Sequence, residues 1–382
     1  MIGLAAKSDN SALLREDLAA KRSVWRGLPE VVSLQTTEVC NFRCIMCPRR
    51  EVPGVLRLDR THLLRVGAEL FPTAWKTIVT GAAGEPVDAD FPALLELCAR
   101  HRVRMDLFTN GSRLDRETYR AGRDVFDQLN VSLDAATAPT FERIRRGGSF
   151  DRTLAMLDAL REERARTPDQ VLLTFSAVVM KSNLAELADL VRLARRFGAD
   201  GVVLQRLRHE VAPTLDEDPL LDPGYERAAP FVEEAARTAR ELGIDLYAAE
   251  IGLPDQIARA KRPKVPEWIG SRFGTCWALA QNFGVMPTGD VYPCCVPTDH
   301  RFGNVMFDDC RTIWNSPAAV GLREAQFSGR GTIFCRGCLY APEFKGGAPG
   351  PVGRLVRRVR LKVAAYRNAR RLRSEPGRRN DF

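Results

Sequence analysis

Hydrophobic positions along the first 250 residues follow two spacings, one typical of buried strands and one typical of amphipathic helices. Apolar residues recur at helical spacing in segments such as Phe91–Arg100 and Asn183–Phe197. Strands that alternate with helices predict parallel βαβ units, and six of them favour an α/β fold with a partial (β/α)6 TIM-type barrel. The predicted strands are short segments rich in β-branched or apolar residues: Val31–Thr37, Thr77–Gly81, Arg104–Thr109, Gln128–Leu133, Val171–Met180 and Gly201–Leu207.

The pattern changes after the sixth predicted strand. A proline-rich acidic stretch, Glu210–Gly224, predicts a loop, Tyr225–Leu242 predicts a helix, and Ile244–Ala249 predicts another strand. From Thr275 to about Phe344, prolines and glycines divide the chain into short runs. We therefore expect a helical extension (1–30), a barrel (31–250), a linker (251–274), a small C-terminal domain (275–345) and a tail (346–382).

Charge is distributed unevenly and singles out the tail. The 382 residues include 57 Lys and Arg and 48 Asp and Glu, a net charge of +9, and residues 351–382 carry the whole excess with 11 basic and two acidic residues. Apolar residues from Val352 to Tyr366 recur at helical spacing between arginines, which predicts a basic amphipathic helix. Such a helix could lie on an anionic membrane, pack on the barrel or bind an acidic partner. Nucleic acid is least favoured, because no separate binding fold accompanies the charge.

Neither a membrane span nor a secretory signal is predicted. The longest strongly apolar run, Val171–Met180, falls short of the roughly 18 to 20 residues that a span needs. The N-terminus lacks a long apolar segment and meets Lys7 and Asp9 early. We expect a cytoplasmic protein, with the tail as a possible contact to the inner face of the membrane. In a reducing compartment, ten cysteines are better explained as metal ligands than as disulfides.

Three cysteines lie directly after the first predicted strand: Cys40, Cys44 and Cys47. Three thiolates with no fourth nearby cannot close a structural zinc site or a four-cysteine iron site. One metal position must stay open. An open position is useful where a substrate or cofactor with chelating groups binds. The three cysteines therefore predict a catalytic metal site rather than a structural one.

The spacing Cys40-x3-Cys44-x2-Cys47 resembles the signature of the radical S-adenosylmethionine (SAM) enzymes. The resemblance implies a [4Fe-4S] cluster on the three cysteines, with SAM chelated to the fourth iron. It implies reductive cleavage of SAM to a 5′-deoxyadenosyl radical, which abstracts hydrogen from a substrate. It also implies a flavodoxin-type or ferredoxin-type reductant as a partner.

Further segments are similar to this family in order and placement. GAAGEP (Gly81–Pro86) resembles the family's GGEP motif, and FTNG (Phe108–Gly111) and VSLDA (Val131–Ala135) end strands that face the cofactor in the family. IRRGGSF (Ile144–Phe150) resembles the segment that follows. Met46 stands where the family often has an aromatic residue near the adenine, a place that a thioether can fill. The cofactor-binding residues that the resemblance implies are Met46, Gly84, Glu85, Pro86, Asn110, Ser132 and Arg145, the last for a carboxylate.

A second set of cysteines comprises Cys276, Cys294, Cys335 and Cys338. Two of them flank a predicted hairpin at Gly289 and two form a Cys-x2-Cys pair, so four thiolates could meet at one point. The order resembles SPASM and twitch domains and implies a second, auxiliary [4Fe-4S] cluster. Phe344 stands where a full SPASM domain would continue with a cysteine, which favours the shortened form. A zinc ribbon with the same four ligands is the structural alternative.

The substrate is the least constrained part of the interpretation. Cys310 or Cys295 could donate a hydrogen atom to a substrate radical, and Arg206 and Arg208 end the sixth strand, where a barrel places its chemistry. We expect a small-molecule substrate, such as a sugar, nucleotide sugar, aminocyclitol or lipid-linked molecule, because only residues 1–30 precede the first strand. Dehydrogenation or epimerisation would be the reaction. A peptide-modifying maturase and a non-catalytic iron–sulfur or zinc redox-sensing protein are the alternatives.

Overall fold

The computed structural model describes residues 2–47, 54–88, 90–166, 171–207, 215–217, 225–248, 276–294 and 300–329. The predicted linker and basic tail lie outside these residues. The strands are β1 (Val31–Gln35), β2 (Lys76–Thr80), β3 (Arg104–Thr109), β4 (Phe126–Ser132), β5 (Leu172–Val179), β6 (Gly201–Arg206), β7 (Asp245–Tyr247), β8 (Asn282–Val285), β9 (Asp290–Tyr292) and β10 (Gly303–Asn304).

Most of the described helices alternate with the strands along the chain. They are α1 (Ile2–Ala19), α2 (Arg60–Leu70), α3 (Phe91–His101), α4 (Arg116–Gly122), α5 (Ala138–Ile144), α6 (Phe150–Ala165), α7 (Leu187–Arg196), α8 (Tyr225–Leu242), α9 (Trp277–Gln281), α10 (Cys310–Trp314) and α11 (Pro317–Phe327), with 3-10 turns η1 (Pro86–Asp88) and η2 (Lys181–Glu186). Several begin at side-chain caps of the kind that helix N-termini favour: Asp115 accepts from the Thr118 amide at 2.8 Å.

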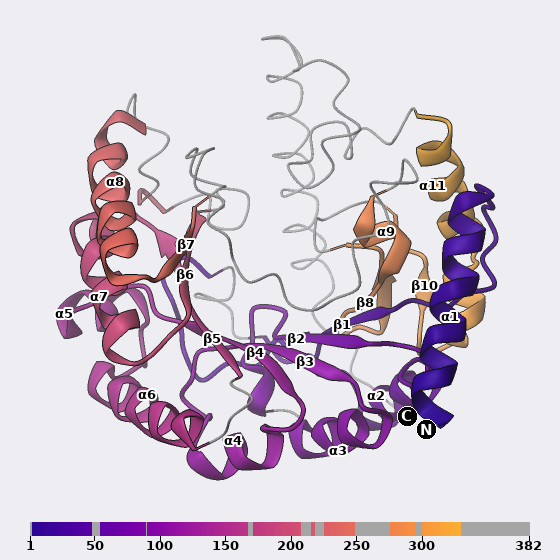
Figure 1. Cartoon of the computed structure of the whole chain (residues 1–382), viewed down its shortest axis with the longest axis horizontal. Helices are drawn as coiled ribbons and strands as arrows, with labels where there is room; N and C mark the ends of the chain where they lie inside the picture. Colours follow the sequence, from indigo (N-terminus) through magenta and orange to yellow (C-terminus); the bar gives the residue numbers. More distant parts are fainter. Residues whose placement is uncertain are drawn as a thin grey trace.

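In the described residues, a single sheet runs in the order β10-β9-β8-β1-β2-β3-β4-β5-β6-β7. Neighbours from β1 to β7 are parallel. Figure 1 shows the sheet curved into an open ring with α2 to α8 on its outer side. Strand residues that face these helices, such as Val79, Leu107, Leu129 and Phe175, are fully buried. The predicted α/β fold with a partial TIM-type barrel is confirmed, and β7 adds a short seventh parallel strand.

The C-terminal segment continues the sheet of the barrel. β8 pairs with β1 in parallel, with Val31 opposite Asn282, and β9 returns antiparallel to β8. The hairpin predicted at Gly289 is present. Gly289 has a φ of 78°, and a Cβ atom there would lie 2.6 Å from Asn304 Oδ1, so glycine is required for two reasons. The domain boundaries given above stay a prediction.

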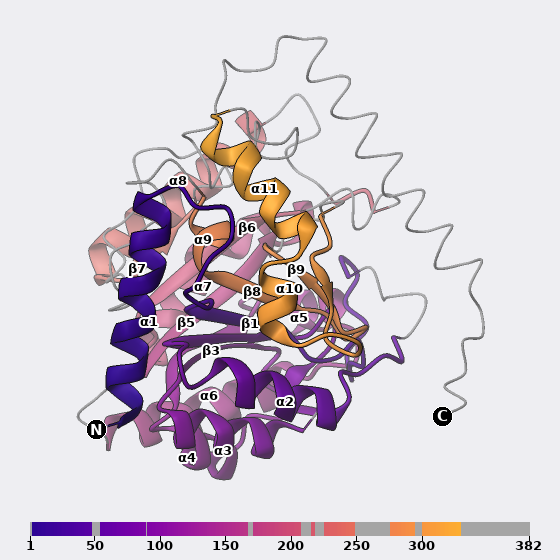
Figure 2. The same ribbon diagram turned by 90° about the vertical axis from the view of Figure 1, so that its right-hand side faces the viewer.

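A buried arginine joins the C-terminal segment to the N-terminal extension. The Arg323 guanidinium carbon of α11 lies 3.6 Å from the ring centre of Trp25 and 4.6 Å from that of Trp314. Its nitrogens donate to the carbonyls of Ser23 and Trp314 at 3.0 and 2.6 Å. Figure 2 shows α1 and α11 on the same side of the molecule. The arginine therefore anchors α11 beside the segment that links α1 to β1.

α1 is held against the barrel by polar side chains as well as apolar ones. Lys7 is 1% exposed, and its ammonium donates to the carbonyls of Ala74 and Arg102, which precede β2 and β3. Burial lowers the pKa of Lys7 to about 8, and the neighbouring Cys98 thiol acts in the opposite direction. The charged form of Lys7 is therefore costly in the folded protein.

This burial predicts a pH dependence of stability that a single substitution removes. The pKa of Lys7 rises from about 8 to its ordinary value of 10.5 on unfolding, so the unfolded chain binds more protons between these pH values and stability rises with pH there. We expect the free energy of unfolding to gain about 2 kcal/mol more in the wild type than in Lys7→Met between pH 8 and pH 10. Chemical denaturation at constant ionic strength measures the difference.

Comparison with the variant is necessary because a second group titrates nearby. Burial raises the pKa of Cys98, so its thiol ionises earlier in the unfolded chain and opposes the Lys7 effect. Cys98 is present in both proteins, and its contribution cancels to first order. Equal pH profiles for the two proteins would contradict the prediction.

Among the described residues, none of the helices combines the length and the apolar character that a membrane span requires.

Candidate functional site

The loop after β1 carries three cysteines and is tied to two neighbouring loops. Its Thr37 and Val39 carbonyls accept from the amides of Ala82 and Glu85, at 2.7 and 2.9 Å. On its other side, the Ile45 amide donates to the carbonyl of Ile144, the last residue of α5, at 2.9 Å. These backbone bonds fix the cysteine loop at the carboxyl ends of the strands, where parallel barrels place their chemistry.

The GAAGEP loop requires small residues because it packs directly on the cysteine loop. A Cβ atom on Gly84 would lie 2.4 Å from the Thr37 carbonyl oxygen, and one on Gly81 would lie 2.0 Å from the Gly84 carbonyl oxygen. Ala83 between them has a φ of 65°, a left-handed conformation that favours glycine. Gly84, which was predicted to contact a cofactor, therefore also allows the two loops to approach each other.

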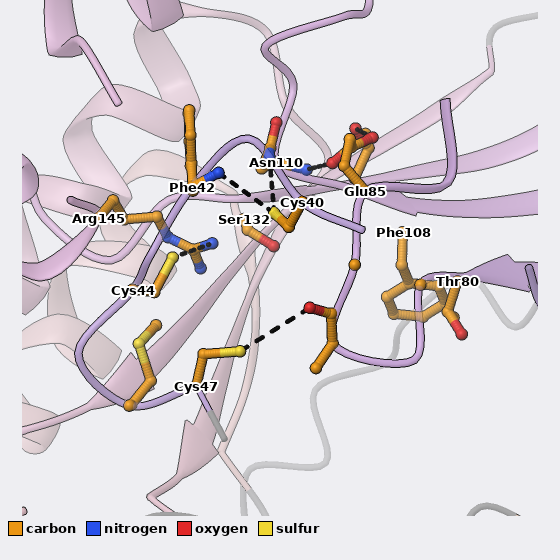
Figure 3. A pocket seen from close by; sticks show the side chains of 15 residues that line it. Cys40, Phe42, Cys44, Cys47, Thr80, Glu85, Phe108, Asn110, Ser132 and Arg145 are labelled. Atoms are coloured by element: carbon orange, nitrogen blue, oxygen red, sulfur yellow. Dashed lines mark hydrogen bonds between the residues drawn. The ribbon is translucent and has the colours of Figure 1, made fainter. Parts of the chain in front are cut away.

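The three cysteines face one cavity of about 220 Å³ (Figure 3). It is lined by Cys40, Phe42, Cys44, Met46, Cys47, Thr80, Gly81, Ala83, Gly84, Glu85, Phe108, Thr109, Asn110, Ser132 and Arg145. The structure thus brings together the first cysteine set and the residues that were predicted to bind a cofactor, with one exception. Pro86 is buried at the start of η1 and does not line the cavity.

Glu85 connects the GAAGEP loop with the end of β3. It is 1% exposed, and its two oxygens accept from the Thr109 hydroxyl at 2.5 Å and the Asn110 amide at 2.7 Å. The Thr109 hydroxyl also accepts from the Gly111 amide at 3.0 Å, which fixes the FTNG turn. A glutamate at this position therefore orders two of the predicted motifs relative to each other.

Burial controls the ionisation of two of the thiols. Burial raises the pKa of Cys44 to about 11, while the Arg145 cation acts in the opposite direction. Burial also raises the pKa of Cys40, against the effect of the Phe42 amide that donates to its sulfur at 3.4 Å. Both thiols are therefore protonated at neutral pH in the absence of metal, and metal binding must release these protons.

The donor set fits an iron–sulfur cluster better than a single ion. Within the described ranges, no three His, Cys, Asp or Glu side chains converge as ligands of one metal ion. The three thiols instead surround a cavity with further room, and thiolates are the usual ligands of [4Fe-4S] clusters. Glu85, Asn110, Ser132 and Arg145 supply polar groups around the same space.

The other candidate catalytic residues lie away from this cavity or outside the described residues. Cys310 is 1% exposed, and its α10 packs against α2, where the Cys310 amide donates to Glu69 at 2.7 Å. Arg206 is exposed at the end of β6 and does not line the cavity. Cys295 and Arg208 lie outside the described residues. The structure therefore brings neither Cys310 nor Arg206 to the first cysteine set.

Half of the second cysteine set is described. Cys276 precedes α9 and Cys294 follows β9, and both are half-buried. The Cys276 amide donates to Gln326 of α11 at 2.9 Å. Cys335 and Cys338 lie outside the described residues. Their joint role as ligands of one cluster stays a prediction.

Phe108 and Thr80 line the cavity but were not among the predicted site residues. Phe108 is 37% exposed, which is unusual for a phenylalanine in a central strand. Their position offers a signal that sequence reasoning could have used. Both lie in the last two residues of predicted strands, where a parallel barrel presents side chains to its site.

Comparisons with known proteins match the two parts of the chain separately. The model of the radical SAM superfamily matches residues 34–194, and the SPASM model, an iron-sulfur cluster-binding domain, matches residues 276–339. Mycofactocin maturase MftC of Mycobacterium ulcerans (strain Agy99) is 28% identical over 84% of this chain and 85% of its own length. GTP 3',8-cyclase of Rhodopseudomonas palustris (strain ATCC BAA-98 / CGA009) is 27% identical over 69% of this chain and 76% of its own length.

The fold is also that of a solved structure. Streptococcus suis SuiB bound to precursor peptide SuiA superposes with a TM-score of 0.61 and 16% identity, over 92% of this chain and 76% of that chain. The matched segments include both cysteine sets, so the cofactors are SAM with a [4Fe-4S] cluster and, in the SPASM segment, auxiliary iron–sulfur rather than zinc. The chain belongs to the radical SAM superfamily and carries a C-terminal SPASM iron–sulfur domain.

Proposed function

We propose that this chain is a radical SAM maturase that modifies a precursor peptide. The observation that carries the proposal is the similarity to mycofactocin maturase MftC, which extends over 84% of this chain and 85% of the relative. In support, SuiB, which shares the fold, was crystallised with its precursor peptide SuiA. The small-molecule substrate expected from the sequence has less support than the peptide-modifying alternative, which becomes the main proposal.

The residues of the cavity have separable tasks in this reaction. Cys40, Cys44 and Cys47 would hold the cluster, which with bound SAM supplies a 5′-deoxyadenosyl radical that abstracts hydrogen. The protein contributes orientation and a site from which water is excluded. The half-exposed ring of Phe108 offers an apolar wall beside the cysteines. Ser132 and Glu85 present oxygen atoms that can hold the polar groups of SAM.

Next to Phe108, the inner face of the sheet offers hydrogen-bonding side chains. In the strand register Phe108 lies opposite Asn130, and Asn130 lies opposite Thr174, so the three share one face. The side-chain oxygen of Asn130 accepts from the Thr174 hydroxyl at 2.5 Å and from the side-chain amide of Gln128 at 2.9 Å. Amide and hydroxyl groups of this kind can pair with the carbonyl and amide groups of a peptide backbone. The apolar wall and the polar row together suit an extended peptide.

The experiment asks whether the natural substrate is destroyed by proteases. The protein, reconstituted anaerobically with both clusters, is given SAM, dithionite and a low-molecular-mass extract of cells that express it. We expect the extract to increase 5′-deoxyadenosine formation several-fold, and we expect protease treatment of the extract to abolish the increase. Boiled, protease-free extract is the control. Stimulation that survives proteolysis would contradict the peptide proposal and favour a small molecule.

A further inference from the structure

Two polar side chains reach the sulfur atoms of the first cysteine set. Asn110 Nδ2 lies 3.8 Å from Cys40 Sγ, and Arg145 Nη1 lies 3.8 Å from Cys44 Sγ. Sulfur accepts hydrogen bonds at such distances, which are longer than those to oxygen. We infer that Asn110 and Arg145 are positioning residues that raise the reduction potential of the cluster on Cys40, Cys44 and Cys47. This inference concerns the reducing step alone and does not depend on the nature of the substrate.

Asn110 is fixed with its amino group toward Cys40. Its side-chain oxygen accepts from the Ser112 amide at 2.9 Å, which determines which end of the amide faces the sulfur. Its Nδ2 atom also donates to Asn41 Oδ1 at 3.0 Å, and its backbone amide donates to Glu85 at 2.7 Å. With 6% of its surface exposed, Asn110 has little freedom to turn away (Figure 3).

Arg145 is a charged group held beside Cys44 in a buried site. It is 8% exposed, and its Nε atom donates to Asp134, whose other oxygen accepts from the Val178 amide at 2.7 Å. An arginine guanidinium is not deprotonated in proteins, and Asp134 forms an ion pair with it inside the site. The guanidinium therefore keeps its positive charge next to the sulfur.

The physical effect on a cluster follows from charge. Reduction adds one electron, and hydrogen-bond donors and positive charge near the ligand sulfurs stabilise that added negative charge. A site screened from water makes each such interaction stronger than it would be at the surface. Asp134 offsets part of the effect of Arg145, but the guanidinium nitrogen is the group that contacts Cys44. Both residues should therefore make the cluster easier to reduce.

The sequence predicts another role for Arg145, contact with the SAM carboxylate. The two roles differ in what a substitution of Arg145 should change. A contact to SAM changes the affinity for SAM and leaves the potential of the SAM-free cluster unchanged. A contact to Cys44 changes that potential in the absence of SAM. Measuring the potential without SAM therefore separates the two roles.

The test is a redox titration followed by electron paramagnetic resonance, on the full protein with both clusters loaded and without SAM. The variants are Asn110→Ala and the double variant Arg145→Met with Asp134→Asn, which avoids leaving Asp134 as an unpaired buried charge. Arg146→Met, at the exposed neighbouring position, is the matched control. The signal of the first cluster is assigned by its loss in Cys44→Ala.

We expect both test variants to shift the potential of the first cluster to more negative values, with the auxiliary cluster and Arg146→Met unchanged. Arg145→Lys retains a positive charge, so its potential should lie between those of the wild type and the double variant. Unchanged potentials in both test variants would overturn the inference. Loss of SAM affinity without a change of potential in the double variant would overturn it for Arg145. Asn110→Ala leaves all buried charges in place, so it tests the inference even where the double variant does not fold.

Discussion

Replacement of Cys44 by alanine should remove the first cluster and reduce 5′-deoxyadenosine formation to the background level. Cys44 is 8% exposed, and it lines the cavity together with Cys40 and Cys47. The two cysteines that remain cannot hold a [4Fe-4S] cluster whose fourth position is left for SAM. We expect the iron content to fall by about four atoms per chain after anaerobic reconstitution. Iron analysis and chromatography of the SAM products measure both effects.

Cys98→Ala is the matched control for this experiment. Cys98 is fully buried on α3 and does not line the cavity. Its loss removes one thiol from the chain and leaves both predicted cluster sites intact, so the iron content and SAM cleavage should match the wild type. Equal iron content and equal 5′-deoxyadenosine formation in Cys44→Ala and Cys98→Ala would show that the cavity is not the cluster site.

Replacement of Arg323 by alanine should destabilise the protein by about 3 kcal/mol. The substitution removes a desolvated cation that contacts the rings of both Trp25 and Trp314, worth about 2 kcal/mol. It also leaves the buried carbonyl of Trp314 and the partly buried carbonyl of Ser23 without this donor, at a cost of about 1 kcal/mol or more. Anaerobic chemical denaturation of the loaded protein measures the loss.

A second arginine on the same part of the chain offers the comparison. Arg311 of α10 is exposed and donates to the Arg26 carbonyl at 3.0 Å, so Arg311→Ala should change stability by no more than about 0.5 kcal/mol. Limited proteolysis should also release the segment from 276 onward faster in Arg323→Ala, since α11 loses its anchor to residues 23–25. Similar losses of stability in the two variants would contradict the proposed anchoring role.

Much of the barrel could be predicted because its signals are local. The predicted strand Arg104–Thr109 and the predicted helix Tyr225–Leu242 have the bounds that the structure shows. The cysteine loop and the FTNG turn follow strands directly, so their common edge could be inferred from strand direction alone. Apolar period and turn residues carry this information within a few positions of each element.

The contacts that refine the site and join the segments had no local signal. Arg145 contacts Cys44 across 101 positions of sequence, and Arg323 reaches Ser23 across 300. The resemblance implied a cofactor contact for Arg145, but a single sequence does not indicate which distant residues either arginine contacts, because an arginine alone resembles a solvated surface residue. The pairing of β8 with β1 was missed for the same reason. A four-residue strand far from its partner along the chain does not reveal which edge it will join.

The pairing of β8 with β1 determines where Cys294 lies relative to Cys40. Cys294 follows β9, whose last residue lies beside Gly284, and the Pro293 carbonyl accepts from Asn282 at 2.9 Å. Asn282 is opposite Val31, the first residue of β1. Cys40 lies in the loop that follows Gln35, the last residue of β1. The five residues of β1 span about 13 Å between the level of Asn282 and the start of the cysteine loop. In the described part of the chain, Cys40 and Cys294 therefore flank one continuous hydrogen-bonded sheet, and the length of β1 sets the spacing between their levels.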